Sequence, residues 1–408
     1  LTQPAVRTLI GAQLVSGLGD WAGRLALSVL VYDRSQSAMW TAMVTVVSLL
    51  PWIGPGQVLA TYADRFGRVR VMVVADIARA AIFAAMLIPQ PIWTLLVLAF
   101  LAGLAVPPFA GSRASTMVEV IEPKLYPSSL ALSGVVSQVE VLAGYAGGGL
   151  MVALIGAETA LAVNALTFLL SALLLRTLRS TTASDRHADT QVGWSGLLAG
   201  LAVWRSDPVC LRALALFVGV SMFMILPEVL VVPFTDEIGL SDTFIGAFAA
   251  LVAVGSIVGI VMMPTAADHV ALLRVAAGRA GLLAAATAAL FSLSATPAVA
   301  GVAFMVSGAV DAIAVPTNQV VGERLPAAGR SAAMSVAGGA QYIGQIVAIA
   351  AAGLMATATL ARIPLIIGMV AAGFVCVWAL ICLLYTSPSP RDHLSYLVCR
   401  LLLEKGGG

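Results

Sequence analysis

Charged residues are scarce in this sequence, and their scarcity sets the class of protein. Only 10% of the 408 residues are charged, whereas 60% are hydrophobic. A water-soluble globule of this length could not stay dissolved with that balance. The apolar residues form about a dozen long runs, each near the roughly 20 residues that a helix needs to cross the hydrocarbon of a bilayer. The composition therefore predicts an integral membrane protein.

Several other features are missing, and each absence excludes a function. The three histidines form no cluster, and the cysteines lack the spacing of a metal or redox site. No Gly-x-x-x-x-Gly-Lys-Ser/Thr phosphate loop, catalytic triad or nucleophile elbow occurs, so neither an ATP motor nor an enzyme is expected. Basic and acidic residues nearly balance, which argues against a nucleic-acid partner. We therefore expect no cofactor and no metal.

The apolar runs predict helices, because lipid cannot satisfy exposed backbone groups and because the runs lack the two-residue alternation of a membrane barrel. Two sets of six spans are expected, at residues 9–32, 39–60, 71–88, 92–112, 130–155 and 159–178, and at 209–234, 244–263, 270–293, 298–315, 332–356 and 363–381. The fold class is therefore all-α, with twelve transmembrane helices in two six-helix bundles, 1–178 and 209–381. The long polar connection 179–208 is the expected linker between them.

Both the linker and the end of the chain need separate interpretation. Within the linker, apolar residues from Trp194 to Trp204 recur at helical spacing. They predict either an amphipathic helix on the membrane surface or the start of the next span. Residues 382–408 resemble a translated sequencing adapter, so we expect a non-native tail there and leave it out of the fold.

Basic residues fall unequally on the two sides of the predicted spans. Without the tail, fifteen of nineteen Lys and Arg residues fall on the side of the N-terminus, whereas only Arg34 and Arg362 fall on the other side. Because short cytoplasmic loops carry an excess of basic residues, we expect both termini in the cytoplasm and the protein in the bacterial inner membrane.

A repeat at a separation of 204 residues relates the two halves. Asp64 corresponds to Asp268, and Gly149 corresponds to Gly353. Pseudo-symmetric halves of this kind suit a transporter that rocks two bundles about a central site.

The stretch 60–70 contains the most specific motif of the chain, formed by Asp64, Arg65, Gly67, Arg68 and Arg70. It resembles the Gly-x-x-x-Asp-Arg-x-Gly-Arg-Arg/Lys hallmark of the major facilitator superfamily, although Ala60 replaces the first glycine. The resemblance implies a gating motif, in which Asp64 caps the eleventh span when the cytoplasmic side is closed. The alternative is that these charges only enforce the topology.

Other segments are similar to a bacterial efflux branch of that family, which includes enterobactin-exporter-like and macrolide-efflux-like proteins. They are residues 17–21, reading Gly-Leu-Gly-Asp-Trp, and residues 200–208. Residues 144–149 are similar to the antiporter signature Gly-Pro-x-x-Gly-Gly, with Tyr145 in place of proline. This resemblance implies export in exchange for protons.

Ionisable residues inside spans are costly in lipid and mark cavities or partners. The candidates for proton coupling or for the cavity are Glu140, Asp20, Arg24 and Asp311. Glu140 has no charged neighbour one turn away, and burial disfavours its charged form, which allows protonation near neutral pH. Asp20 and Arg24 lie on one helical face and are expected to pair. Asp76 and Arg79, one turn beyond the motif, are interpreted as structural.

Small and aromatic residues have two interpretations each. The glycine-rich helix carries Gly144, Gly147, Gly148 and Gly149. These residues allow close helix packing, which in this fold can also set how the bundle bends. Four aromatic residues could hold a hydrophobic substrate or contact lipid and neighbouring helices: Trp21, Tyr145, Phe223 and Tyr342.

The sequence as a whole predicts a monomeric transporter that exports a small amphipathic compound, drug-like or siderophore-like, in exchange for protons. Its partners are then the substrate, protons and the lipid bilayer. A facilitator or nutrient importer of the same fold is the first alternative. A non-transporting membrane sensor or assembly factor is the second, which the lack of a large extramembrane domain disfavours.

Overall fold

The computed structural model describes residues 4–56, 58–59, 66–120, 126–178, 201–205, 207–264, 268–294, 296–325 and 330–384. Within these ranges the elements are helices, and no strand occurs. Ten of the helical stretches are long and apolar enough to cross a membrane. Two further helices, α2 and α4, complete the twelve spans expected from the sequence, so the prediction of fold class is confirmed.

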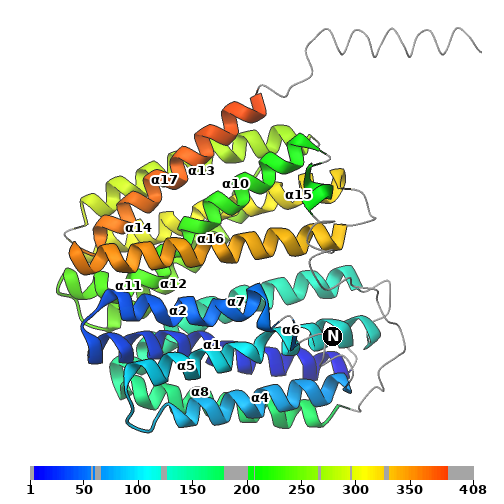
Figure 1. Cartoon of the computed structure of the whole chain (residues 1–408), viewed down its shortest axis with the longest axis vertical. Coiled ribbons are helices and arrows are strands. Elements are labelled where there is room, and N and C mark those ends of the chain that lie inside the picture. The colour runs from blue at the N-terminus through cyan, green and yellow to red at the C-terminus, as the bar shows by residue number, and fades with distance from the viewer. Residues whose placement is uncertain are drawn as a thin grey trace, which may run out of the picture.

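The first half of the chain forms one bundle (Figure 1). Its helices are α1 (Pro4–Ser35), α2 (Ala38–Ile53), α4 (Arg68–Ala85), α5 (Ile92–Leu104), α6 (Val106–Val120), α7 (Tyr126–Ile155) and α8 (Ala157–Arg176). Helix α1 packs against α7 and α8, while α4 packs against α6 and α8. Together α5 and α6 make a single span.

The second half forms the other bundle. Its elements are α10 (Pro208–Met224), α11 (Leu226–Glu237), α12 (Thr243–Val261), α13 (His269–Ser292), α14 (Pro297–Val310), η1 (Asp311–Ile313), α15 (Ala314–Arg324), α16 (Arg330–Ala358) and α17 (Arg362–Leu384). Helix α13 packs against α14 and α17, and α10 packs against α16 and α17. Contacts between the bundles run mainly from α2 to α16 and from α7 to α12.

Three spans are interrupted near prolines. The break between α5 and α6 comes next to Pro107, and the break between α10 and α11 comes next to Pro227. The third break, at η1, lies just before Pro316. Proline lacks an N–H and clashes with the preceding turn, so a helix that contains it bends or restarts.

The 204-residue repeat is visible in the contacts between the bundles. A Cβ at Gly149 of α7 would lie 2.3 Å from the Cα of Gly246 on α12. In the equivalent contact, a Cβ at Gly353 of α16 would lie 2.7 Å from the Cβ of Ala42 on α2. The equivalent residues Tyr32 and Asp236 touch each other, since the Tyr32 hydroxyl donates a hydrogen bond of 2.8 Å to Asp236 Oδ2. The bundles therefore meet pseudo-symmetrically where α1 and α11 end.

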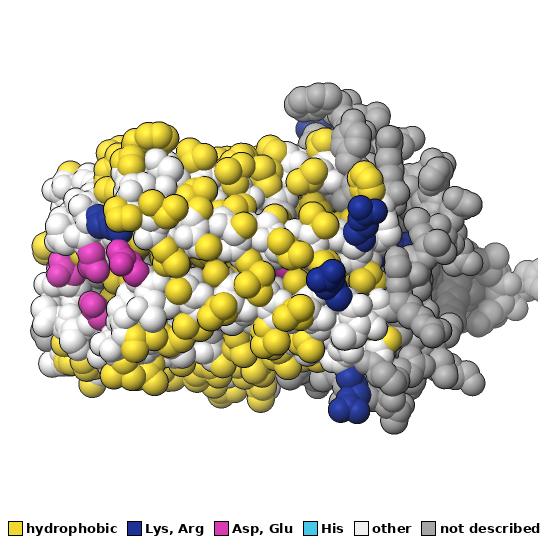
Figure 2. Space-filling model, turned by 90° about the horizontal axis from the view of Figure 1, so that it is seen from below, with side chains coloured by type: hydrophobic (Ala, Val, Ile, Leu, Met, Phe, Trp, Pro, Cys, Tyr) yellow, Lys and Arg dark blue, Asp and Glu magenta, His cyan; other side chains and the backbone are white. Residues whose placement is uncertain are grey.

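Charge is separated along the molecule. Figure 2 shows the acidic side chains gathered at one end of the visible face with basic atoms beside them, further basic side chains at the other end, and apolar side chains between the two ends. Where α1 ends, Arg34 pairs with Glu158 of α8 at 2.9 Å. In the other bundle Arg362 of α17 pairs with Glu237 of α11. One ion pair thus joins α1 to α8, and a second joins α11 to α17 in the other bundle. The basic residue is on α1 in the first pair and on α17 in the second, so the acidic and basic partners are exchanged between the bundles.

The described part of the linker packs against the second bundle through Trp204. Residues 201–205 are helical, whereas 179–200 lie outside the described residues. The Trp204 side chain is 1% exposed, and its Nε1 donates a hydrogen bond of 2.7 Å to the carbonyl of Ala333. It therefore faces the second bundle and not a membrane surface. Asp207 then caps α10, so residues 201–205 are separated from the span by a cap.

The last described helix reaches slightly beyond the expected boundary. Helix α17 ends at Leu384, and Leu383 is fully buried in the second bundle. Arg274 Nε donates a hydrogen bond of 3.1 Å to the Leu383 carbonyl. The expected tail beyond residue 384 lies outside the described residues.

Candidate functional site

Aromatic and charged side chains converge where the two bundles meet. The Tyr145 hydroxyl on α7 donates a hydrogen bond to Glu228 Oε1 on α11, which links the bundles. The ring of Tyr145 lies 5.2 Å from that of Trp21 on α1, and Arg24 places its guanidinium 4.9 Å from the same Trp21 ring. We call these four residues, together with the Trp52–Tyr342 pair described next, the interface site.

A second aromatic pair comes from the other two helices that join the bundles. Trp52 of α2 and Tyr342 of α16 are stacked, with ring centroids 5.6 Å apart and an interplanar angle of 27°. The charge of Arg24 acts on Tyr342, Tyr145 and Glu228, which places it beside both aromatic pairs. The structure therefore unites Trp21, Tyr145 and Tyr342 of the predicted cavity. Phe223 instead packs near Gly368 of α17.

Glu228, which lies next to Pro227, belongs to the interface site but is not among the candidate residues chosen from the sequence. The signal that identifies it is the repeat, because Glu228 follows Arg24 by the same 204 residues that separate Gly149 from Gly353. The hydrogen bond to Tyr145 could not be inferred, since it joins different bundles.

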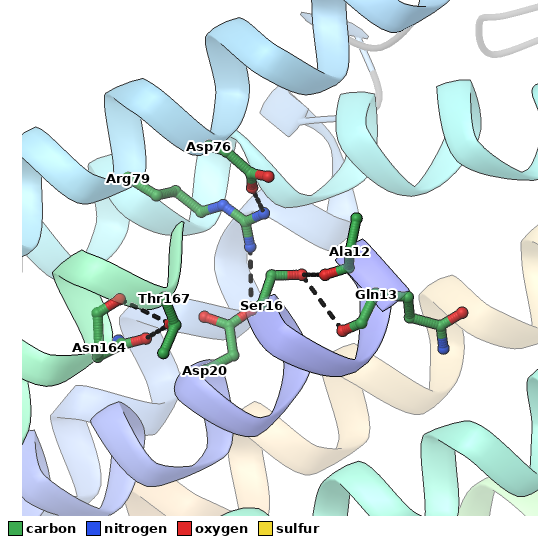
Figure 3. Close-up of polar contacts among 8 residues, drawn as sticks. All are labelled: Ala12, Gln13, Ser16, Asp20, Asp76, Arg79, Asn164 and Thr167. Atoms are coloured by element: carbon green, nitrogen blue, oxygen red, sulfur yellow. Dashed lines mark hydrogen bonds and ion pairs between the residues drawn. The ribbon is translucent and has the colours of Figure 1, made fainter. Parts of the chain in front are cut away.

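The expected pair of Asp20 and Arg24 is wrong. Asp20 accepts a hydrogen bond of 3.0 Å from Arg79 Nη1, and Nη2 of the same guanidinium bonds to Asp76 (Figure 3). Arg79 is 2% exposed and Asp76 is fully buried. Two carboxylates therefore share one buried guanidinium, which holds α1 against α4.

Aromatic rings complete the environment of Arg79. Its guanidinium carbon lies 4.3 Å from the ring centroid of Phe168 and 4.8 Å from that of Phe109. Cation–π contacts of this kind strengthen when they are desolvated. The cluster is fixed by four helices of the first bundle, which supports a structural role for Asp76 and Arg79.

Glu140 is buried, but it is not isolated as its own helix suggested. It is 6% exposed on α7, and Arg113 of α6 and Gln13 of α1 face it. Arg113 also donates a hydrogen bond to Gln13. Glu140 Oε1 has no hydrogen-bond partner among the residues that the structure describes, and a Cβ at Gly17 would lie 2.5 Å from its carboxyl carbon. Glycine at position 17 thus makes room for a carboxyl group packed among three helices.

Asp311 lies apart from these clusters, in the η1 break of its span. Its side chain is exposed, and Oδ2 accepts a hydrogen bond of 3.4 Å from Ser256 of α12. Among the described residues no group of His, Cys, Asp and Glu side chains could hold a metal ion.

The four glycines of the glycine-rich helix α7 have different neighbours. A Cβ at Gly144 would lie 2.5 Å from the Cβ of Trp21, and one at Gly148 would lie 2.6 Å from the Cα of Ala22, so both pack on α1. Gly149 packs on the other bundle, and Gly147 faces open space. Three of the four glycines therefore meet a close neighbour.

Only part of the gating motif lies in the described residues. Gly67 precedes α4, and Arg68 and Arg70 belong to its first turn. Asp64 and Arg65 lie outside the described residues, so the cap on the eleventh span stays a prediction. Asp268, the repeat equivalent of Asp64, accepts hydrogen bonds from the backbone of the following helix α13.

Twelve spans in two pseudo-symmetric bundles, with charged and aromatic side chains between them, define a multi-span membrane transporter. The family model of the Major Facilitator Superfamily matches residues 9–326. The chain therefore belongs to the Major Facilitator Superfamily.

Relatives and solved structures agree with this assignment. The multidrug efflux pump Tap of Mycobacterium tuberculosis is 31% identical over 214 residues, which cover 48% of each chain. The match thus spans about half the length of that relative. A bacterial homologue of the human lysosomal transporter Spinster, in an inward-facing and unoccupied conformation, shares the fold with a TM-score of 0.71 and 14% identity, covering 96% of this chain and 100% of its own. A D-xylose–proton symporter has a TM-score of 0.70 and 15% identity, with coverage of 94% and 97%.

Proposed function

We propose that the protein is a secondary active transporter that exports a small amphipathic compound in exchange for protons. The observation that carries this proposal is the interface site, which lies between two bundles that touch where α1 and α11 end. Arg24 precedes Tyr32 by eight residues, so the site lies about 12 Å along α1 from the Tyr32–Asp236 contact. Rocking the bundles about this site would break that contact and open the site to the other side.

The orientation follows from the charge asymmetry. We place the basic end in the cytoplasm, with both termini inside and the protein in the bacterial inner membrane. The domains are then 1–178, a cytoplasmic linker at 179–208, and 209–381. In this orientation the contacts at Tyr32 close the outer side, and the motif from Asp64 to Arg70 closes the inner side in the opposite state.

Glu140 is the proposed proton-coupling residue, with Asp20 and Asp311 as further candidates. Its carboxylate faces Arg113, and Arg113 already has a second partner in Gln13. A proton on Glu140 removes its attraction for Arg113 while Gln13 keeps the guanidinium hydrogen-bonded. Protonation can therefore loosen α7 from α6 without leaving Arg113 unpaired.

Everted membrane vesicles test coupling and direction together. A fluorescent drug-like dye should accumulate inside vesicles that carry an inward-acid pH gradient, and an uncoupler should abolish this accumulation. Glu140→Gln should lose gradient-driven accumulation but keep dye-for-dye exchange, which needs no proton. Glu140→Asp, which keeps a titratable group, is the matched control. Uphill transport retained by Glu140→Gln would reject Glu140 as the coupling residue.

A facilitator or importer of the same fold is the competing function, because the fold is shared with a D-xylose–proton symporter. Dye efflux from intact cells distinguishes them. Efflux that an uncoupler does not change would reject the antiport mechanism. Accumulation of the dye in energised cells above that in cells without the protein would favour import.

A further inference from the structure

Arg24 and Glu228 occupy equivalent positions in the two bundles. The 204-residue repeat makes Arg24 of α1 and Glu228 of α11 equivalent residues. Eight residues further along these helices, the equivalent residues Tyr32 and Asp236 are in direct contact. The equivalent faces of α1 and α11 are therefore opposite each other between the bundles, and they carry charges of opposite sign.

These two charges are held by aromatic side chains and not by each other. Arg24 lies over the ring of Trp21, and Glu228 accepts a hydrogen bond from Tyr145. The charge of Arg24 acts on Glu228, yet the two residues form no ion pair. A neutral partner binds a charge less strongly than an opposite charge does. A ligand with charged groups can therefore replace both contacts.

Aromatic rings flank the two charges on both sides of the bundle interface. The Trp21–Tyr145 pair comes from α1 and α7, and the stacked Trp52–Tyr342 pair comes from α2 and α16. Ligand sites of this kind combine apolar walls with a few fixed polar groups that set the orientation of the ligand. The rings suit a flat, unsaturated ligand, and the two charges suit its ends.

We propose that the interface site binds amphoteric aromatic compounds, with the acidic group of the ligand at Arg24, its basic group at Glu228, and its rings against the two aromatic pairs. This inference rests on the proposed export function only for its transport consequence, because the binding preference is a property of the site itself. A purely cationic or purely anionic ligand leaves one of the two charges unmatched.

Three dyes of one shape test the preference. A rhodamine with a free carboxyl group is a zwitterion, its methyl ester is a cation, and fluorescein is an anion. Binding to the purified protein in nanodiscs is measured by fluorescence anisotropy. We expect the zwitterion to bind at least tenfold more tightly than the ester or fluorescein. Equal affinities, or no binding of any of the three dyes, would overturn the inference.

Single substitutions assign each charge to one end of the ligand. Arg24→Gln should lower the affinity for the zwitterion at least tenfold and leave the affinity for the ester unchanged. Glu228→Gln should lower the affinity for the zwitterion and leave the affinity for fluorescein unchanged. Exchange of both charges, Arg24→Glu with Glu228→Arg, should restore binding of the zwitterion, since it can bind in the reverse direction. Arg34→Gln, outside the site, is the control. Loss of all three dyes to the same extent in both single variants would contradict the assignment.

Vesicle transport of the same dyes separates this inference from the proposed function. Preferential binding without transport into everted vesicles would reject export and retain the site. Transport of the three dyes at equal rates, insensitive to Arg24→Gln, would retain export and reject the site.

Discussion

The contact between Gly149 and Gly246 makes the sharpest prediction for conformational change. In Gly149→Ala the new Cβ would lie 2.3 Å from the Cα of Gly246 and 2.7 Å from its backbone nitrogen. Carbon atoms in contact prefer about 3.5–4.0 Å, so α7 and α12 must separate by roughly 1 Å or more. Overpacking of this kind costs about 1–3 kcal/mol.

The cost applies to one conformation only, because the contact joins different bundles. It destabilises the state in which the bundles meet beside Tyr32 and leaves the interior of each bundle intact. A difference of about 1–3 kcal/mol changes an equilibrium by about 5–150-fold. Gly149→Ala should therefore shift the protein strongly toward the state that is open at this end.

Spin labels report this shift directly. Labels on exposed positions of the two bundles at this end, Thr159 and Ser241, should give a longer distance in Gly149→Ala than in the wild type. Gly147→Ala, with nothing within 4 Å, should leave the distance unchanged. Gly255→Ala, whose Cβ would lie 1.7 Å from the Met305 carbonyl oxygen inside one bundle, should lower thermal stability instead. An unchanged distance in Gly149→Ala, or a loss of stability like that of Gly255→Ala, would refute the reasoning.

Two further predictions concern stability. Arg79→Met leaves Asp76 buried without its partner and should lower the free energy of unfolding by about 3–5 kcal/mol. Adding Asp76→Leu should recover most of that loss in thermal unfolding, and no recovery would argue against an uncompensated charge as the cause. Asp207→Ala removes the cap of α10 and should cost about 0.5–2 kcal/mol. The measurement is detergent-solubilised thermal unfolding at neutral pH, where an unchanged midpoint would contradict the capping role.

The cap at Asp207 also predicts a pH dependence. Burial opposes ionisation of Asp207, but hydrogen bonds from Arg324 and from the backbone of Val209 and Cys210 outweigh it and lower its pKa below the usual range. The stabilisation is then fully present above the unfolded pKa of about 3.9 and is lost as the pH falls through the lower folded value. The difference between wild type and Asp207→Ala should therefore be constant from pH 7 to about pH 5 and shrink only in stronger acid.

Much of the fold could be predicted because hydropathy and length act locally. Twelve runs near the thickness of a bilayer determine twelve helices wherever their neighbours lie. The 204-residue repeat predicts that the two halves are equivalent. Gly149 packs against α12 and Gly353 packs against α2, the equivalent helix of the other half. Breaks inside spans, as at Pro227, follow from proline chemistry, but hydropathy does not reveal their positions.

The partners of the candidate residues could not be predicted in the same way. Asp20 and Arg24 share a helical face, yet Asp20 bonds to Arg79, which is 59 residues away and on another helix. Glu140 has no charged neighbour along its own helix, but Arg113 approaches it from α6. Helical spacing reports neighbours along one helix only, whereas the polar contacts of Asp20, Glu140 and Tyr145 join different helices.

The sequence by itself determined that this protein is a helical, multi-span membrane protein with repeated halves, a basic side and a motif similar to that of its family. Each of these properties depends on residue type and spacing along the chain. Only the tertiary structure decided that Arg24 and Glu228 face the same interface, that Tyr145 links the bundles and that Gly149 meets Gly246. These contacts depend on how each helix is rotated about its axis and on which helices are its neighbours. The helices have similar apolar surfaces on all sides, so the local sequence does not determine that rotation or those neighbours.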